Sequence, residues 1–338
     1  MTPARVDSFG YTIASWVLTG TMLVLILLLH LLPALLAGML VYELVHLMEP
    51  AIHKRFPARR ETLIAVALLS ALVVVLMTAA IFGLIVFFNS EAGSVSALLA
   101  KMAEIIESSR ATMPEWLFGQ MPTQPDDVQE AAVQWLREHS TAVQLAGAEV
   151  GRALLYVLIG MVLGAMVALH EALPMEPRRV LANALIERVA RLGSAFRRVV
   201  FAQLRISLLN TFFTGIYLAL LLPLFGVDLP LKKTLIAVTF ITGLLPVLGN
   251  LISNTVIVVV SLSYSGQAAI ASLVFLIVIH KLEYFLNARI IGKRIESRAW
   301  ELIAAMLAME AAFGISGVIA APIYYAYIKD ELAERGVI

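Results

Sequence analysis

A few polar side chains lie inside long apolar runs of this chain, where they could bind or couple a solute. Glu310 comes first, because a carboxylate deep in an apolar run is costly unless it is paired, hydrated or neutral. We predict that Glu310 couples ion or proton movement, and the alternative is an interhelical ion pair. Arg205 and Asn210 share another apolar run. Asn210 is a candidate solute ligand, and Arg205 is a candidate for ion coupling unless its long side chain only reaches the membrane surface.

A second group of candidates surrounds a break in a long uncharged run. From Thr234 to Ile279 the chain has 46 residues without Asp, Glu, Lys or Arg, interrupted at 243–250 by Gly-Leu-Leu-Pro-Val-Leu-Gly-Asn. A straight helix of this length would reach roughly 69 Å, against about 30 Å for the hydrocarbon core of a bilayer. The apolar pieces before and after the break would reach only about 18 Å and 21 Å as helices. The run is therefore predicted to fold back inside the membrane.

The break itself is a candidate solute site. Irregular backbone inside a bilayer survives only where protein or a water-filled cavity surrounds it, since its N–H and C=O groups cannot face lipid. The asparagines that follow the break either cap freed N–H groups or meet a solute, and the sequence leaves both open. A packing kink is the remaining alternative. The predicted solute-binding residues at this break are Pro246, Gly249, Asn250 and Asn254.

The last apolar stretch, residues 300–328, is interrupted in a similar way by Gly314 and Gly317. Its two halves, about 21 Å each as helices, predict a second hairpin that enters the membrane from the opposite face. Paired, interrupted segments of this kind point to a transporter's solute site near the midplane of the bilayer. Both glycines therefore join the predicted solute site. The alternative is one tilted span in which the glycines only permit close helix packing.

The composition places these elements in a membrane. The 338 residues are 60% hydrophobic and 14% charged, and the mean hydropathy is +0.89, as expected for a polytopic membrane protein. We predict an all-α fold with about six full transmembrane helices and two re-entrant hairpins, which makes eight apolar segments. A net charge of +1, with basic residues in short clusters, argues against nucleic-acid binding. The absence of cysteine excludes disulfides and thiolate metal sites, and no cofactor is expected.

Lys and Arg residues set the expected orientation, since they favour cytoplasmic loops. Basic clusters follow the second apolar segment and the fourth, where an Arg-rich loop is predicted to extend to Arg198. The acidic region between the third and fourth segments is placed outside, so the N-terminus is cytoplasmic. That region is expected to lie on the membrane or to pack against itself, unless it forms a subunit interface. The predicted parts are N-terminal transmembrane helices (1–89), an extracytoplasmic amphipathic helical insert (90–152) and a C-terminal transport core (153–338) with broken segments at 234–264 and 300–328.

Five short motifs follow one another along the chain. They are Phe201-Ala-Gln203, Gly226-Val-Asp-Leu-Pro230, Pro246-Val-Leu-Gly249, Arg289-Ile-Ile-Gly292-Lys293 and Gly314-Ile-Ser-Gly317-Val-Ile-Ala-Ala-Pro322. In this order they resemble the AI-2E family of permeases, over nearly the whole chain. The resemblance implies a bacterial inner-membrane protein that forms homo-oligomers. Relatives export the quorum-sensing signal autoinducer-2 or exchange sodium or lithium for protons. Gln203, in the first motif, joins the predicted solute ligands. Asn250, where the family more often has proline, and Arg205, where it is usually apolar, depart from the pattern.

The sequence therefore predicts a secondary transporter that exports a small polar solute such as autoinducer-2 by alternating access around broken helices. A Na⁺(Li⁺)/H⁺ antiporter is the first alternative, although only Glu310 is a well-placed intramembrane carboxylate. The second is a non-transporting membrane scaffold that recruits a partner through the insert. No enzyme is predicted, because G-x-S-x-G and P-loop motifs are missing and Pro174 interrupts the zinc motif begun by His170-Glu171. The expected partners are a small-molecule or ion substrate, the lipid bilayer and further copies of the chain.

Overall fold

The computed structural model is helical wherever regular structure is described. The described residues are 4–55, 59–90, 94–109, 133–135, 137–139, 147–171, 180–245, 248–291, 299–334 and 336. Within them the all-α class is confirmed. Four stretches are long and apolar enough to cross a membrane, namely Gly10–Leu28, Leu63–Asn89, Gly151–His170 and Val180–Leu224. Shorter apolar helices of 10–17 residues are Leu32–Met48, Leu248–Leu262 and Gly266–Lys281.

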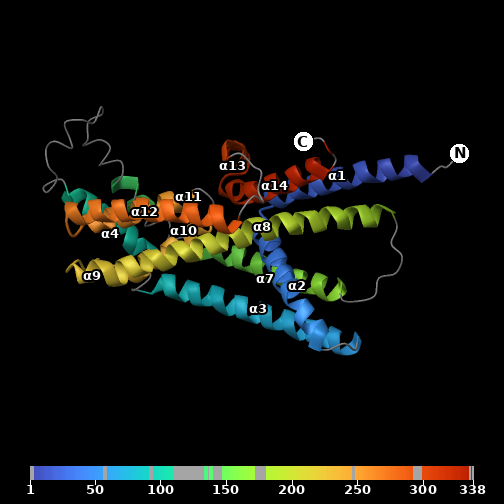
Figure 1. Ribbon diagram of the computed structural model, residues 1–338, viewed down its shortest axis with the longest axis horizontal. Coiled ribbons are helices and arrows are strands. Elements are labelled where there is room, and N and C mark those ends of the chain that lie inside the picture. The colour runs from blue at the N-terminus through green and yellow to red at the C-terminus, as the bar shows by residue number, and fades with distance from the viewer. Residues whose placement is uncertain are drawn as a thin grey trace. The chain divides into compact units, whose positions relative to one another are not determined.

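The helices can be followed in chain order by their labels and colours (Figure 1). The first part of the chain forms α1 (Ala4–Leu28), α2 (Leu32–Arg55), α3 (Arg59–Asn89), α4 (Val95–Ser109) and α7 (Gly147–Glu171). The second part forms α8 (Val180–Ile216), a π-helical turn η1 (Tyr217–Leu221), α9 (Leu222–Leu224), α10 (Lys232–Gly243), α11 (Leu248–Leu262), α12 (Gly266–Ile291), α13 (Ala299–Phe313) and α14 (Ile315–Glu334).

The chain divides into two compact units, and each is described by itself. The first unit comprises Met1–Ile81, Val150–Val200 and Ser297–Ile338, and the second comprises Phe82–Glu149 and Phe201–Glu296. The helix α8 therefore contributes its first part to one unit and its remainder to the other. The three-part division expected from the sequence stays a prediction.

The core of the first unit is formed by α1, α2, α8 and α14, with Phe196 among its fully buried side chains. In the same unit, α2 and α7 meet at small residues. A Cβ atom added to Gly160 would overlap the backbone of Ala34, and one added to Gly164 would overlap that of Gly38. The two backbones are therefore as close as only small residues permit, a common device for packing helices within membranes.

The core of the second unit lies between α4, α10, α11, α12 and the π-helical turn. Leu98 and Met102 of α4 are buried there together with Leu235 of α10 and Ile257 of α11. The amphipathic helix expected in this part of the insert is present. Its apolar side is covered by α11 and the rest of this core, so α4 does not use that side to lie on a membrane.

The helix α8 corrects one sequence prediction. The Arg-rich stretch that ends at Arg198 was expected to be a loop, with a span beginning at Phe201, but the structure has one continuous helix from Val180 to Ile216. At 37 residues it is about 55 Å long, which exceeds a bilayer core. Its charged side chains can pack against neighbouring helices because acidic residues of those helices pair with them.

Candidate functional site

The predicted break in the uncharged run is a helical hairpin. Its arms are α10 and α11, of 12 and 15 residues, or about 18 Å and 22 Å. Gly249 lies in the first turn of α11, where an added Cβ would overlap the carbonyl of Thr242 near the end of α10. The arms therefore touch backbone to backbone, which requires glycine at this position. The predicted site residue Pro246 lies outside the residues that the structure describes.

The end of α10 shows how the freed carbonyls of the hairpin are satisfied. The last four carbonyls of an α-helix have no partner within the helix. Here the Leu244 N–H donates to Ile241 O at 3.2 Å, and the Leu245 N–H donates to Thr242 O at 2.8 Å. These tight turns leave the carbonyls of Phe240 and Gly243 to be satisfied from elsewhere.

Two side chains of α8 satisfy the remaining carbonyls. The Gln203 amide donates from Nε2 to Gly243 O at 2.7 Å, and the Ser207 hydroxyl donates from Oγ to Phe240 O at 2.6 Å. Gln203 and Ser207 are one turn apart on α8, which matches the spacing of the two acceptors on α10. A Cβ on Gly243 would lie 2.8 Å from Ser207 Oγ, so the glycine makes room for this hydroxyl.

The same face of α8 also contacts the second arm of the hairpin. The Asn210 amide donates to Asn250 Oδ1 at 2.8 Å, and Asn250 Nδ2 lies 3.3 Å from His280 Nδ1 of α12. The structure therefore brings the predicted residues Gln203, Asn210, Gly249 and Asn250 together at one hairpin. Asn254 follows one turn later on α11 and is half-buried.

A seam of polar residues continues along α8 beyond Asn210. Thr214 is fully buried, and its hydroxyl has no hydrogen-bond partner among the described residues. In the π-helical turn, the Tyr217 hydroxyl lies 2.9 Å from Ser272 Oγ of α12, which lies 2.7 Å from Ser261 Oγ of α11. The hydroxyls and amides of the seam thus link α8 and the π-helical turn to α11 and α12.

Part of this seam was not predicted from the sequence. Gln203 and Asn210 were predicted as solute ligands, but the members between and beyond them were not. A signal was available, because the polar side chains of the seam recur every three or four residues along a mostly apolar stretch, which places them on one face. The members that were missed on this face are Ser207, Thr214 and Tyr217.

The second break is also a hairpin, so the interpretation of one tilted span is wrong. Its arms α13 and α14 lie side by side, in red in Figure 1. Gly314 connects them with φ of 61°, a left-handed conformation that favours glycine. A Cβ on Gly317 would overlap the carbonyl of Met309. Gly317 thus acts in α14 as Gly249 acts in α11. That the two hairpins enter the membrane from opposite faces stays a prediction.

The two residues predicted to couple ions are exposed within their units. Glu310 lies on α13, and its side chain makes no ion pair with the part of the chain that the structure describes. Arg205 donates from Nε to the carbonyl of Phe201 in its own helix at 3.1 Å. Neither contact pattern supports the alternative of an interhelical ion pair within these units.

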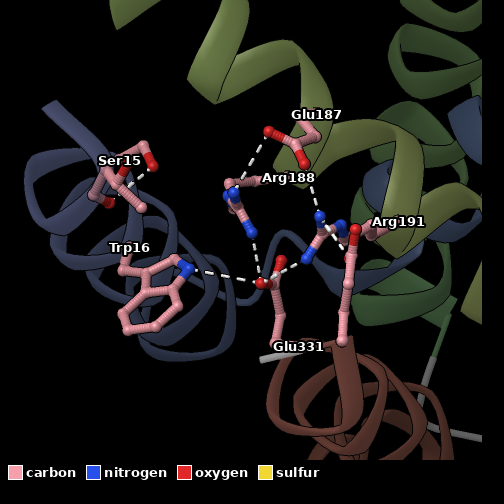
Figure 2. Close-up of polar contacts among 8 residues, drawn as sticks. Ser15, Trp16, Glu187, Arg188, Arg191 and Glu331 are labelled. Carbon is pink, nitrogen blue, oxygen red and sulfur yellow. Dashed lines mark hydrogen bonds and ion pairs between the residues drawn. The ribbon is translucent and has the colours of Figure 1, made fainter. Parts of the chain in front are cut away.

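Charged residues do pair extensively in the first unit, around Glu331 near the end of α14. Figure 2 shows Trp16 of α1 and both Arg188 and Arg191 of α8 directed at this carboxylate. Trp16 Nε1 donates to Oε2 at 3.2 Å and Arg191 Nη1 donates at 2.8 Å, while Arg188 donates from Nη1. Arg188 is only 2% exposed. Burial of a guanidinium requires such a partner, because its desolvation is otherwise uncompensated.

Further ion pairs join α8 to the same unit. Arg197 Nε lies 2.5 Å from Glu43 Oε2 of α2, and Glu43 is 2% exposed. Arg198 pairs with Asp330 of α14. Four arginines in the first part of α8 therefore bind acidic residues of α2 and α14. None of these pairings was predicted from the sequence.

The fold and these contacts define a class, a multi-pass helical membrane protein with two interrupted helical segments. Comparison with known proteins makes this more specific. The sequence model of the AI-2E family transporters matches residues 12–334 of the 338-residue chain, and the chain belongs to this family. The resemblance read from the motifs is thereby confirmed, and the family is one of membrane transporters. No curated protein matches the chain, and no solved structure does.

Proposed function

We propose that this transporter moves a small polar solute such as autoinducer-2 out of the cell, and that the first hairpin holds the solute. The observation that carries the proposal is the contact between α8 and the hairpin, where Gln203, Ser207 and Asn210 bind groups at its broken end. Interrupted helices place backbone dipoles and polar side chains where a solute can meet them. The proposal includes a bacterial inner-membrane location with a cytoplasmic N-terminus, which the distribution of Lys and Arg supports.

The chemistry of the hairpin favours a polar solute over a cation. The side chains at its broken end are amides and hydroxyls, together with His280, and no carboxylate takes part in the contacts described above. A dehydrated cation within a membrane needs several oxygen ligands and usually a negative charge. For this reason a Na⁺(Li⁺)/H⁺ antiporter is the less favoured proposal.

Flux into proteoliposomes tests the proposed function. Purified protein is reconstituted, and autoinducer-2, Na⁺ and H⁺ gradients are applied side by side. We expect autoinducer-2 flux, and we expect Asn210→Leu to reduce it about tenfold because the partner amide of Asn250 then loses a hydrogen bond in a partly buried site. Flux of Na⁺ against H⁺ without autoinducer-2 flux would favour the antiporter. The absence of any flux would favour the scaffold.

Proton coupling through Glu310 is tested separately. The proposal is motivated by the position of this carboxylate within an apolar helix, where its side chain is exposed within its unit and an unpaired charge would be costly in lipid. We expect Glu310→Gln to remove the dependence of solute flux on a pH gradient while the protein remains folded. The measurement is initial flux at several external pH values at fixed internal pH. A variant with the pH dependence of the unmodified protein would eliminate Glu310 as the coupling group.

A further inference from the structure

We propose that Gln203 occupies the place of the solute at the first hairpin, and that a solute hydroxyl displaces its amide from the Gly243 carbonyl. This inference rests on the proposed function, because it names a binding step at the same hairpin. With its amide on Gly243 O, Gln203 lets the protein satisfy its own binding group. The site prefers solutes that donate hydrogen bonds and carry no charge.

The carbonyls at the end of α10 are the groups that can accept a hydrogen bond from a solute. Of the last four carbonyls of α10, those of Ile241 and Thr242 are satisfied by the backbone turn. The carbonyls of Phe240 and Gly243 depend on side chains of α8. Carbonyls at the C-terminal end of a helix also carry its partial negative charge, so they attract donors. A solute that binds here must therefore donate.

Gln203 and Ser207 differ in how freely their side chains can leave the carbonyls that they bind. Ser207 is fully buried, and its short side chain is held between its own helix and Gly243. Gln203 is only half-buried and has three side-chain torsions. It can turn away from Gly243 O by rotating these torsions, whereas Ser207 has one side-chain torsion and is enclosed by protein. The Gly243 carbonyl is accordingly the acceptor that a solute can reach, and Ser207 keeps α10 in place.

The broken end of this hairpin lacks a charged partner for a cation among the contacts that the structure describes. The side chains that form hydrogen bonds there are the amides of Gln203, Asn210 and Asn250, the hydroxyl of Ser207 and the imidazole of His280. A charged solute would lose its hydration at such a site without a counter-ion, which costs far more than neutral hydrogen bonds return. A neutral, hydroxyl-bearing solute loses less hydration free energy, and its hydroxyl can donate to the Gly243 carbonyl in place of the Gln203 amide.

The test uses the sign of a change in apparent affinity. In Gln203→Met the new side chain has a similar volume but no hydrogen-bond donor. A solute then no longer competes with an amide for the Gly243 carbonyl. We expect the KM for autoinducer-2 flux in proteoliposomes to fall about fivefold, since one neutral hydrogen bond no longer has to be broken. If Gln203 instead binds the solute directly, KM rises, and an unchanged KM also overturns the inference. Thr255→Val is the matched control, because the exposed Thr255 hydroxyl bonds only to Leu251 O of its own helix, at 2.8 Å.

Two further measurements complete the test. Competition by unlabelled ribitol and ribonate compares a neutral polyol with its carboxylate analogue, and we expect ribitol alone to compete. Equal competition by ribonate would overturn the preference for uncharged solutes.

If Gln203→Met does not yield a folded protein by size-exclusion chromatography, Gln203→Ala replaces it, and KM is again expected to fall. If the unmodified protein moves no solute, the proposed function itself is wrong. If the unmodified protein moves solute but KM does not fall in Gln203→Met, only this inference is wrong.

Discussion

Glu331→Gln is expected to destabilise the protein by about 3 kcal/mol, because it leaves a buried guanidinium without its charged partner. Glu331 is buried, and one of its oxygens accepts from Trp16, Arg188 and Arg191. Glutamine keeps the size of the side chain but removes the charge that compensates the buried Arg188. Glu187 remains close to Arg188 at 3.2 Å, but Glu187 is half exposed and its attraction is weakened by solvent.

The measurement is thermal unfolding of the detergent-solubilised protein, followed by size-exclusion chromatography after heating. A change of this size corresponds to a lower Tm by about 4 °C for a chain of 338 residues. Glu334→Gln is the matched control on the same helix. Glu334 also pairs with Arg191, but its side chain is 59% exposed, so its removal is expected to cost little. Equal effects of the two variants would show that the buried position of Glu331 carries no special stability.

The hairpins were predictable from the sequence because they follow from a length limit. Short apolar pieces that end at Gly or Pro have few ways to satisfy their backbone in a membrane, so the breaks themselves indicated where the chain turns. The second arm α14 is longer than predicted, because the helix continues beyond Ile328 into Lys329 and Asp330. The end of the helix was predicted from the end of the apolar run. Charged residues end an apolar run, but they do not end a helix.

The same limitation explains the error at α8. The sequence between Val180 and Arg198 was taken for a loop because of its arginines, although it contains no Pro and only one Gly. Arginine is itself a good helix former, and what the segment could not reveal is that its arginines pack within the fold against acidic partners far away in the chain, such as Glu331 for Arg188, which are 143 residues apart. A pattern within one segment carries no information about such partners. The site residues Asn210 and Asn250 were selected individually for the same reason, and their pairing emerged only from the fold.

Gly317→Ala and Gly249→Ala are expected to separate the arms of the two hairpins. In each hairpin a glycine in the first turn of the second arm meets a carbonyl of the first arm, that of Met309 or of Thr242. A methyl group at either position overlaps backbone, which cannot rotate aside as a side chain can. Overpacking of this kind costs about 1–3 kcal/mol, and it also displaces the groups at the hairpin end. We expect each variant to lower solute flux in proteoliposomes about tenfold or more, since small displacements of a binding group have large effects.

Gly83→Ala is the control that separates close approach from the general effect of removing a helical glycine. Gly83 lies within α3, and a Cβ there meets nothing within 4 Å. Alanine at this position favours the helix by about 0.5–1 kcal/mol. The three substitutions are chemically identical, so any difference in flux or Tm among them reports the space around each glycine. If Gly317→Ala or Gly249→Ala behaves like Gly83→Ala, that hairpin does not need backbone contact between its arms, and the positions of the groups at its end are set by the side chains of other helices alone.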